Sequence, residues 1–115
     1  MQYAMFVVVD PDGEPYVEAD DDFAAWDADL EARGIMLAKE RLRPADEATT
    51  IRVRGGQTII TDGPFTESKE WIAGFAILRC TDLDEAIAIA RTHAMARFGR
   101  IEVRALSAPD GSPIE

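Results

Sequence analysis

The sequence has 115 residues, 47% of them hydrophobic, and its 22 acidic against 12 basic side chains give a net charge of −10. This length and hydrophobic content fit one folded domain and exclude a disordered segment, and no apolar run approaches the roughly 18 residues of a membrane helix. The first 32 residues hold ten acids and no base, whereas acids and bases balance in the rest, so this negative surface argues against direct binding of nucleic acid or an anionic membrane.

The N-terminal part predicts a strand, a helix and a second strand. Gln2–Val9 is β-branched and aromatic at consecutive positions, which is typical of a strand covered on both faces. A helix is predicted over about 22–33, capped by an aspartate of the 20–22 run and ended by Gly34. Ile35–Leu42 then alternates as a strand.

The predicted first helix has an acidic side away from its apolar stripe, which includes Asp27 and Glu31. Such a side is usually a solvated face that aids solubility. The other interpretation is a docking surface for a basic protein partner. The sequence leaves both open.

The middle of the chain predicts a hairpin and a further buried strand. Thr49–Arg54 and Gln57–Thr61 are short β-rich runs separated by Gly55-Gly56, a strong signal for a two-residue hairpin turn. A polar loop covers residues 62–70. Trp71–Cys80 is then apolar on both faces, like the first strand.

The C-terminal part predicts a second helix and a closing strand. The helix is capped by Thr81 or Asp82 and reaches about Ala96. Arg100–Leu106 is the closing strand, and residues 107–115 are predicted to be a tail. The apolar spacing of the helix predicts a buried stripe of Leu83, Ala86, Ile87, Ala90 and Ala94.

These elements predict a single α+β domain over residues 1–106. Without the hairpin the order is β-α-β-β-α-β, the ferredoxin-like split βαβ arrangement, in which both helices cover one face of the sheet. The strands Gln2–Val9 and Trp71–Cys80 would then leave large apolar residues on the other face. Because such a surface favours association, we expect a second copy to pack sheet to sheet, giving a homodimer.

The most distinctive run is Asp62-Gly63-Pro64-Phe65, followed by Glu67, Lys69 and Glu70. With other segments in the same order, it is similar to the DGPF branch of the YCII-related protein family over nearly the whole chain. Those segments are Gly34, Leu42-Arg43-Pro44, Thr50-Ile51-Arg52, Gly74, Leu83-Asp84-Glu85-Ala86 and Ile101-Glu102-Val103-Arg104. A single four-residue motif would be weak support for the resemblance, whereas a set of motifs in the same order along the chain is strong support.

The resemblance implies a dimeric α+β barrel built from two ferredoxin-like halves. Some YCII-related proteins are enzymes, among them a dehydrochlorinase acting on a chlorinated hydroxyhydroquinone, and others are encoded beside, or fused to, extracytoplasmic-function sigma factors. The enzymes are proposed to use a histidine of the first helix and an aspartate as an acid/base pair. The first helix predicted here has no histidine and His93 lies in the second, so the resemblance transfers no such pair.

Five residues are candidates for a functional site. Asp62 is the candidate catalytic residue, as a general base at a pocket mouth; alternatively its carboxylate accepts backbone N–H bonds within its turn. The candidate ligand-binding residues are Lys69, Glu67, Arg43 and Arg104. The two arginines could clamp a carboxylate, or border the sheet in pairs with neighbouring glutamates.

We therefore expect a cytoplasmic homodimer that binds a small organic acid or aromatic ligand between sheet and helices near Asp62. If it is an enzyme, lyase- or isomerase-type proton transfer by Asp62 is expected. The alternative is a non-catalytic accessory or regulatory protein of an extracytoplasmic-function sigma factor system. No cofactor or metal is expected, because no glycine-rich loop opens a helix and Cys80 and His93 are too few for a zinc site. The lone cysteine fits a reducing compartment, and His93 is expected at a helix end or an interface.

Overall fold

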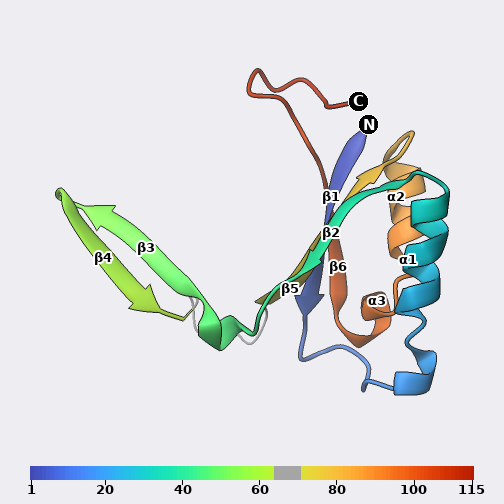
Figure 1. Cartoon of the computed structure of the whole chain (residues 1–115), viewed down its shortest axis with the longest axis horizontal. Coiled ribbons are helices and arrows are strands. Elements are labelled where there is room, and N and C mark those ends of the chain that lie inside the picture. Colours follow the sequence, from blue (N-terminus) through green and yellow to red (C-terminus); the bar gives the residue numbers. More distant parts are fainter. Residues whose placement is uncertain (64–70) are drawn as a thin grey trace.

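The computed structural model describes residues 1–63 and 71–115. They form a four-stranded antiparallel sheet in the order β2-β5-β1-β6 with helices on one face, and a separate β3–β4 hairpin that projects on the opposite side (Figure 1). The strands are β1 Gln2–Val9, β2 Met36–Arg41, β3 Thr49–Arg54, β4 Gln57–Asp62, β5 Trp71–Arg79 and β6 Arg100–Ala105. The helices are α1 Phe23–Ala32, α2 Leu83–Ala90 and α3 Met95–Phe98, with short 3-10 helices η1 Glu18–Asp20 and η2 Ala45–Glu47.

The fold is the predicted mixed α+β arrangement with a hairpin inserted between β2 and β5. β5 lies between β1 and β2, and β6 pairs with the other side of β1, a strand order compatible with the ferredoxin-like prediction. Each strand begins and ends within one residue of the predicted position. None of the described helices has the length and apolarity needed to cross a bilayer.

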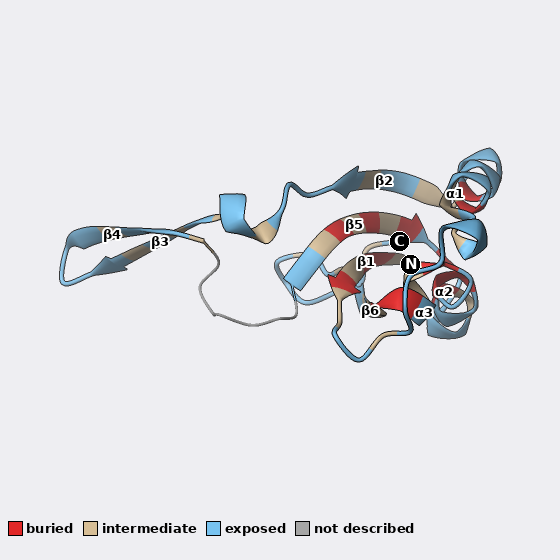
Figure 2. Cartoon of the chain, turned by 90° about the horizontal axis from the view of Figure 1, so that it is seen from below, coloured by how far each residue is buried: buried red, intermediate tan, exposed pale blue. Residues whose placement is uncertain are grey.

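The hydrophobic core lies between the sheet and the two longer helices. Met5 of β1 and Leu78 of β5 are almost fully buried on the helix-covered face. Leu30 of α1 and Ala86 and Ile89 of α2 belong to the same cluster. Figure 2 shows the buried positions along β1 and β5 and on the adjoining helices, whereas the hairpin is mainly exposed.

The opposite face of the sheet is apolar at its centre. The β1–β5 register places Phe6 beside Phe75, and Ala4 beside Ile77, on the face opposite Met5. Phe6, Phe75 and Ile77 are only partly buried. The described helices α1, α2 and α3 lie on the other side of the sheet (Figures 1 and 2). The two strands are thus apolar on both faces, as the sequence indicates.

The second helix is shorter than predicted. α2 ends at Ala90 instead of continuing to about Ala96. The Thr92 hydroxyl donates to the Ile89 carbonyl at 2.6 Å, and the His93 N–H donates to the Ala90 carbonyl, three residues back, at 3.1 Å. These bonds tighten the chain into a turn, because the hydroxyl competes for a carbonyl of the last helical turn.

The predicted stripe of this helix is buried only in part: Ala86, Ala90 and Ala94 are buried as predicted, and the other two members are not. Leu83 and Ile87, both in the predicted stripe, are about half exposed, at 50% and 49%. The residues that face the sheet are Ala86, Ile89 and Ala90, all buried. Two alanines let the helix approach the sheet closely, and Ile89 fills the remaining space.

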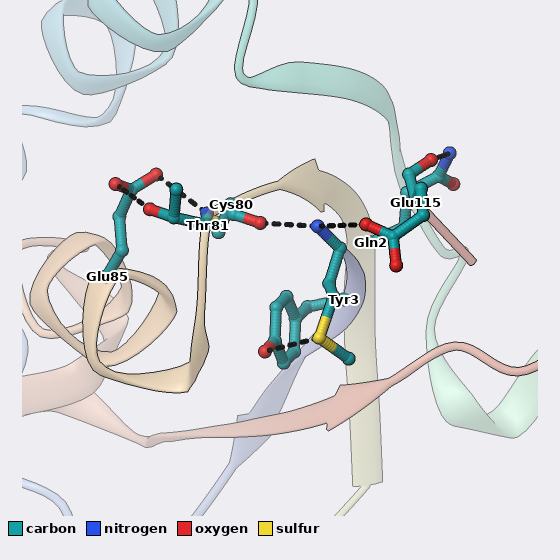
Figure 3. Close-up of polar contacts among 7 residues, drawn as sticks. Gln2, Tyr3, Cys80, Thr81, Glu85 and Glu115 are labelled. Atoms are coloured by element: carbon teal, nitrogen blue, oxygen red, sulfur yellow. Dashed lines mark hydrogen bonds and ion pairs between the residues drawn. The ribbon is translucent and has the colours of Figure 1, made fainter. Parts of the chain in front are cut away.

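Hydrogen bonds attach both chain ends to the sheet (Figure 3). The Met1 amino group donates to the Cys80 carbonyl at 2.6 Å and lies 3.8 Å from the Glu115 carboxylate. The Gln2 side-chain amide donates to the Glu115 carbonyl at 3.1 Å. Residues 107–115, predicted as a tail, therefore fold back so that the C-terminus lies beside the start of β1.

Candidate functional site

A cavity of about 740 Å³ opens between α1 and the helix-covered face of β1, β2 and β5. This volume lies in the range of small-molecule sites. Polar groups reach the cavity from three places: the start of α1, the α2–α3 turn and the end of β2. Its aromatic lining residues are Tyr16, Phe23, Trp26, Trp71 and Phe75, and its other polar ones are Asp21, His93, Lys39, Glu40, Arg41 and Arg43.

His93 lies in the turn between α2 and α3, and its ring is held by aromatic neighbours. The residue is 5% exposed. Its ring centroid is 4.7 Å from that of Trp26 in an edge-to-face arrangement and 5.4 Å from that of Phe23. Trp26 is fixed in turn, because its indole N–H donates to the Thr92 hydroxyl at 2.9 Å. The two helices thus set the orientation of the imidazole.

The hydrogen bonding of His93 determines which ring nitrogen carries the proton. The Met95 N–H donates to Nδ1 at 2.9 Å, so Nδ1 acts as an acceptor. Burial lowers the pKa of His93, and this effect exceeds the opposite influence of the Asp21 and Asp22 carboxylates. The ring is therefore neutral near pH 7, with its proton on Nε2. His93 lines the cavity, and Nε2 is its nitrogen that can donate a hydrogen bond.

Asp21 and Tyr16 form a hydrogen-bonded pair on the cavity wall. The Tyr16 hydroxyl donates to Asp21 Oδ2 at 2.6 Å, and the Phe23 N–H donates to Oδ1 at 3.2 Å. The phenol bond first, and the backbone bond second, lower the pKa of Asp21. The same phenol bond raises the pKa of Tyr16. Asp21 thus remains ionised and accepts the N–H of the first residue of α1, whereas the N-cap residue, Asp22, makes no side-chain cap bond, so the cap predicted from the 20–22 run is not formed in the usual way.

Lys39 uses its charge to hold β2 against α1. Its ammonium group contacts the Asp27 carboxylate and lies 3.2 Å from the Glu31 carboxylate. The Asp27 side chain is only 14% exposed, so this ion pair is more shielded from water than an ordinary surface pair. Both acids of the predicted acidic face are therefore paired within the chain.

Two arginines, the last residue of β2 and one just beyond it, bring positive charge to a cavity lining that also contains the acids Asp21 and Glu40. Arg41 lies near enough to Tyr16 and Asp21 for its charge to lower the pKa of Asp21. Arg43 is exposed and forms an ion pair with Glu47 at 2.9 Å. The site therefore combines charged groups of both signs, an apolar wall rich in aromatic residues and the neutral imidazole of His93.

The structure places one of the five predicted site residues at this cavity. Arg43 lines it. Asp62 is exposed at the end of β4, and Arg104 is exposed on the helix-free face of β6; neither is part of the lining. Glu67 and Lys69 lie outside the described residues.

The residues that the sequence-based prediction did not assign to a site are Asp21, Arg41 and His93. A signal for His93 was present, since the single histidine of the chain lies off the apolar stripe of its helix. Asp21 is indistinguishable in sequence from its acidic neighbours, and only the fold brings it to the cavity. Within the described ranges, no three His, Cys, Asp or Glu side chains gather in a way that could hold a metal ion.

Comparison with known proteins relates this chain to one family and to one uncharacterised protein. A family model described as the YCII-related domain matches residues 1–108. An uncharacterised protein of Rhizobium meliloti (strain 1021) is 45% identical to this chain over 69 residues, which are 58% of this chain. The match covers 56% of that protein, so the chain spans little more than half the length of this relative.

Proposed function

This chain belongs to the YCII-related family, and we propose that it binds a small organic acid or aromatic molecule in the cavity between α1 and the sheet. The observation that carries the proposal is the pairing of a neutral, oriented donor on His93 with the positive charge of Arg41 in one cavity of about 740 Å³. A few fixed polar groups on an otherwise apolar wall are what orients a small ligand.

The charges of the lining suggest how such a ligand lies. A carboxylate is attracted to Arg41 and Arg43 and repelled by the ionised Asp21. A flat ring then lies against Trp26 and its neighbours, which allow stacked and edge-to-face contacts. An oxygen further along the ligand accepts the Nε2–H bond of His93.

The same arrangement supports the lyase- or isomerase-type chemistry proposed for this protein. A neutral imidazole that donates to a ligand oxygen stabilises negative charge developing there, as in an enolate. Asp62 remains the proposed base. In a single chain it lies outside the cavity, so this role depends on an assembly that brings the end of β4 to a cavity.

We also propose that the chain is a DGPF-branch protein and acts as a cytoplasmic homodimer with a dimeric α+β barrel. The half-buried Phe6, Phe75 and Ile77 on the helix-free face support the sheet-to-sheet contact. The free thiol of Cys80, which is buried, is consistent with a reducing compartment.

The alternative of an accessory protein for an extracytoplasmic-function sigma factor system has less structural support. It relies on acids such as Asp27 and Glu31 to meet a basic partner, and these two are occupied by Lys39. A basic partner would have to bind the other acids of the first 32 residues.

Ligand titration followed by NMR tests the binding proposal. With ¹⁵N-labelled protein, benzoate, 4-hydroxybenzoate and cyclohexanecarboxylate serve as probes, and the Trp26 indole and His93 ring signals are the readout. We expect at least one aromatic acid to shift both signals, with affinity reduced at least tenfold in Arg41→Gln. The matched control is Arg54→Gln, which changes an arginine of the hairpin outside the cavity lining.

Two outcomes would contradict the proposal. One is that none of the probes shifts the Trp26 and His93 signals at millimolar concentration. The other is equal affinity in Arg41→Gln and Arg54→Gln. The ¹⁵N shifts of the unliganded ring give a separate check, because a proton on Nδ1 would remove the donor role assigned to His93.

A further inference from the structure

The β3–β4 hairpin exposes an apolar face that its own chain does not cover. The register pairs Ile51 with Ile60 and Val53 with Thr58, so these four side chains share one face. Ile51, Val53 and Ile60 are 65%, 58% and 65% exposed. We propose that the hairpin is a dimerisation arm that packs this face against a second copy of the chain, an inference that rests on the homodimer proposed above.

The arm is poorly supported as long as it stands alone. A single two-stranded hairpin is marginally stable in water and needs a third strand or another packing layer. In the described chain, β3 and β4 pair only with each other (Figures 1 and 2). The Cα radius of gyration is 16.3 Å, against about 13 Å for a compact domain of this length. The chain therefore extends a segment whose stability requires an external contact.

The position of the arm identifies a second copy as its occupant. The arm reaches out on the side of the sheet away from the helices (Figures 1 and 2). That is also the side on which Phe6, Phe75 and Ile77 form the apolar, half-buried centre of the sheet. A copy that covers this face therefore enters the space beside the arm, and two-fold symmetry gives each protomer the partner's arm in return.

Charge favours the same occupant. The arm carries Arg52 and Arg54 against Asp62, whereas the whole chain has a net charge of −10. Two strongly acidic chains repel each other, and a basic arm laid on an acidic partner reduces that repulsion. Arg52 and Arg54 pair with Ile59 and Gln57, so they lie on the face of the arm opposite the apolar one and contribute to its overall charge, not to the apolar contact.

Dilution experiments on the full-length chain test the arm. The double variant Ile51→Thr/Ile60→Thr keeps β-branched side chains but removes the apolar contact. We expect the wild type to dimerise in sedimentation velocity, and the dimer dissociation constant to rise at least tenfold in the double variant. The matched control, Gln57→Thr, lies on the other face of the hairpin and should leave it unchanged. Hydrogen exchange of the hairpin amides should slow as protein concentration passes the dissociation constant.

The outcomes separate this inference from the earlier proposals. A wild type that stays monomeric at several hundred micromolar overturns both arm and homodimer. A wild-type dimer whose dissociation constant is unchanged in Ile51→Thr/Ile60→Thr, or whose hairpin amides exchange equally fast at all concentrations, overturns the arm alone. Ligand binding at Arg41 is read from Trp26 and His93, so its success or failure is independent of the hairpin result.

Discussion

Leu78 and Ile60 are both aliphatic residues on β-strands, yet one is fully buried and the other is 65% exposed. Leu78 lies on the face of the four-stranded sheet that α1 and α2 cover. Ile60 lies on a hairpin that no helix or third strand of the described chain supports. The same β-forming pattern therefore has two outcomes, depending on whether a covering layer is available within the chain.

The comparison shows what apolar alternation in a sequence means. It predicts that a face will be buried, but it does not state which molecule buries it. In the covered half, the helices between the strands supply the layer, and the space left beside α1 becomes the cavity. In the hairpin, no layer of the described chain covers the apolar face. This uncovered face is the physical basis for assigning its contact to another chain.

The largest expected difference between the halves is in stability. Leu78→Ala should lower the free energy of unfolding by about 2–5 kcal/mol, since it removes packed methyl groups and leaves a cavity. Ile60→Ala should lower it by less than about 0.5 kcal/mol in a dilute monomer, because the side chain is already in water. Urea denaturation measures both. A similar loss in both variants would mean that the hairpin packs within its own chain.

The fold was predictable from sequence where its determinants are local. Strand alternation and turn residues act over a few positions, and the strands accordingly begin and end within one residue of the prediction. The end of α2 was not predictable in this way, because Thr92, whose hydroxyl bond tightens the turn, also accepts a hydrogen bond from Trp26, 66 residues away along the chain. The apolar spacing within residues 82–96, from which the longer helix was predicted, contains no information about a contact with a residue so far away in the sequence.

The candidate site was less predictable than the fold. Arg43 was a candidate because an arginine beside a strand can clamp a carboxylate, and it does line the cavity. Asp62 came from a motif, but β4 carries it onto the hairpin and away from the cavity of its own chain. His93 reaches the cavity only because α2 stops early and the following turn directs its ring at Trp26. Composition and spacing contain no information about such long-range placement.

A smaller difference between the helix-covered core and the hairpin should appear in the pH dependence of the free energy of unfolding. The pKa of His93 is lowered by burial below its ordinary value of 6.5, whereas residues 49–62 contain no histidine. As pH falls below about 6.5, the unfolded chain takes up a proton that the folded chain resists until its own lower pKa is reached. The free energy of unfolding should therefore fall by at most about 1.4 kcal/mol per pH unit in this window.

Urea unfolding at pH 7.5, 6.5 and 5.5 measures this slope. His93→Gln should flatten it, because no other buried histidine remains. Aspartates with a lowered pKa, such as Asp10 and Asp21, lose their contribution only below about pH 4, outside this range. An unchanged slope in His93→Gln would assign the titration to another group and contradict the neutral ring.

The smallest expected effect uses two glycines with the same backbone requirement. Gly34 ends α1 at φ 72°, and Gly56 lies in the hairpin turn at φ 78°; a Cβ at either position would meet no atom within 4 Å. Alanine should therefore cost about 1 kcal/mol of backbone strain at each site. Gly34→Ala should move the urea midpoint, because α1 unfolds with the core. Gly56→Ala should leave the midpoint of a dilute monomer unchanged and instead accelerate hydrogen exchange of the β3 and β4 amides about fivefold.

A shift of the global midpoint by Gly56→Ala equal to that of Gly34→Ala would mean that hairpin and core unfold as one unit, and the independence of the arm would have to be abandoned.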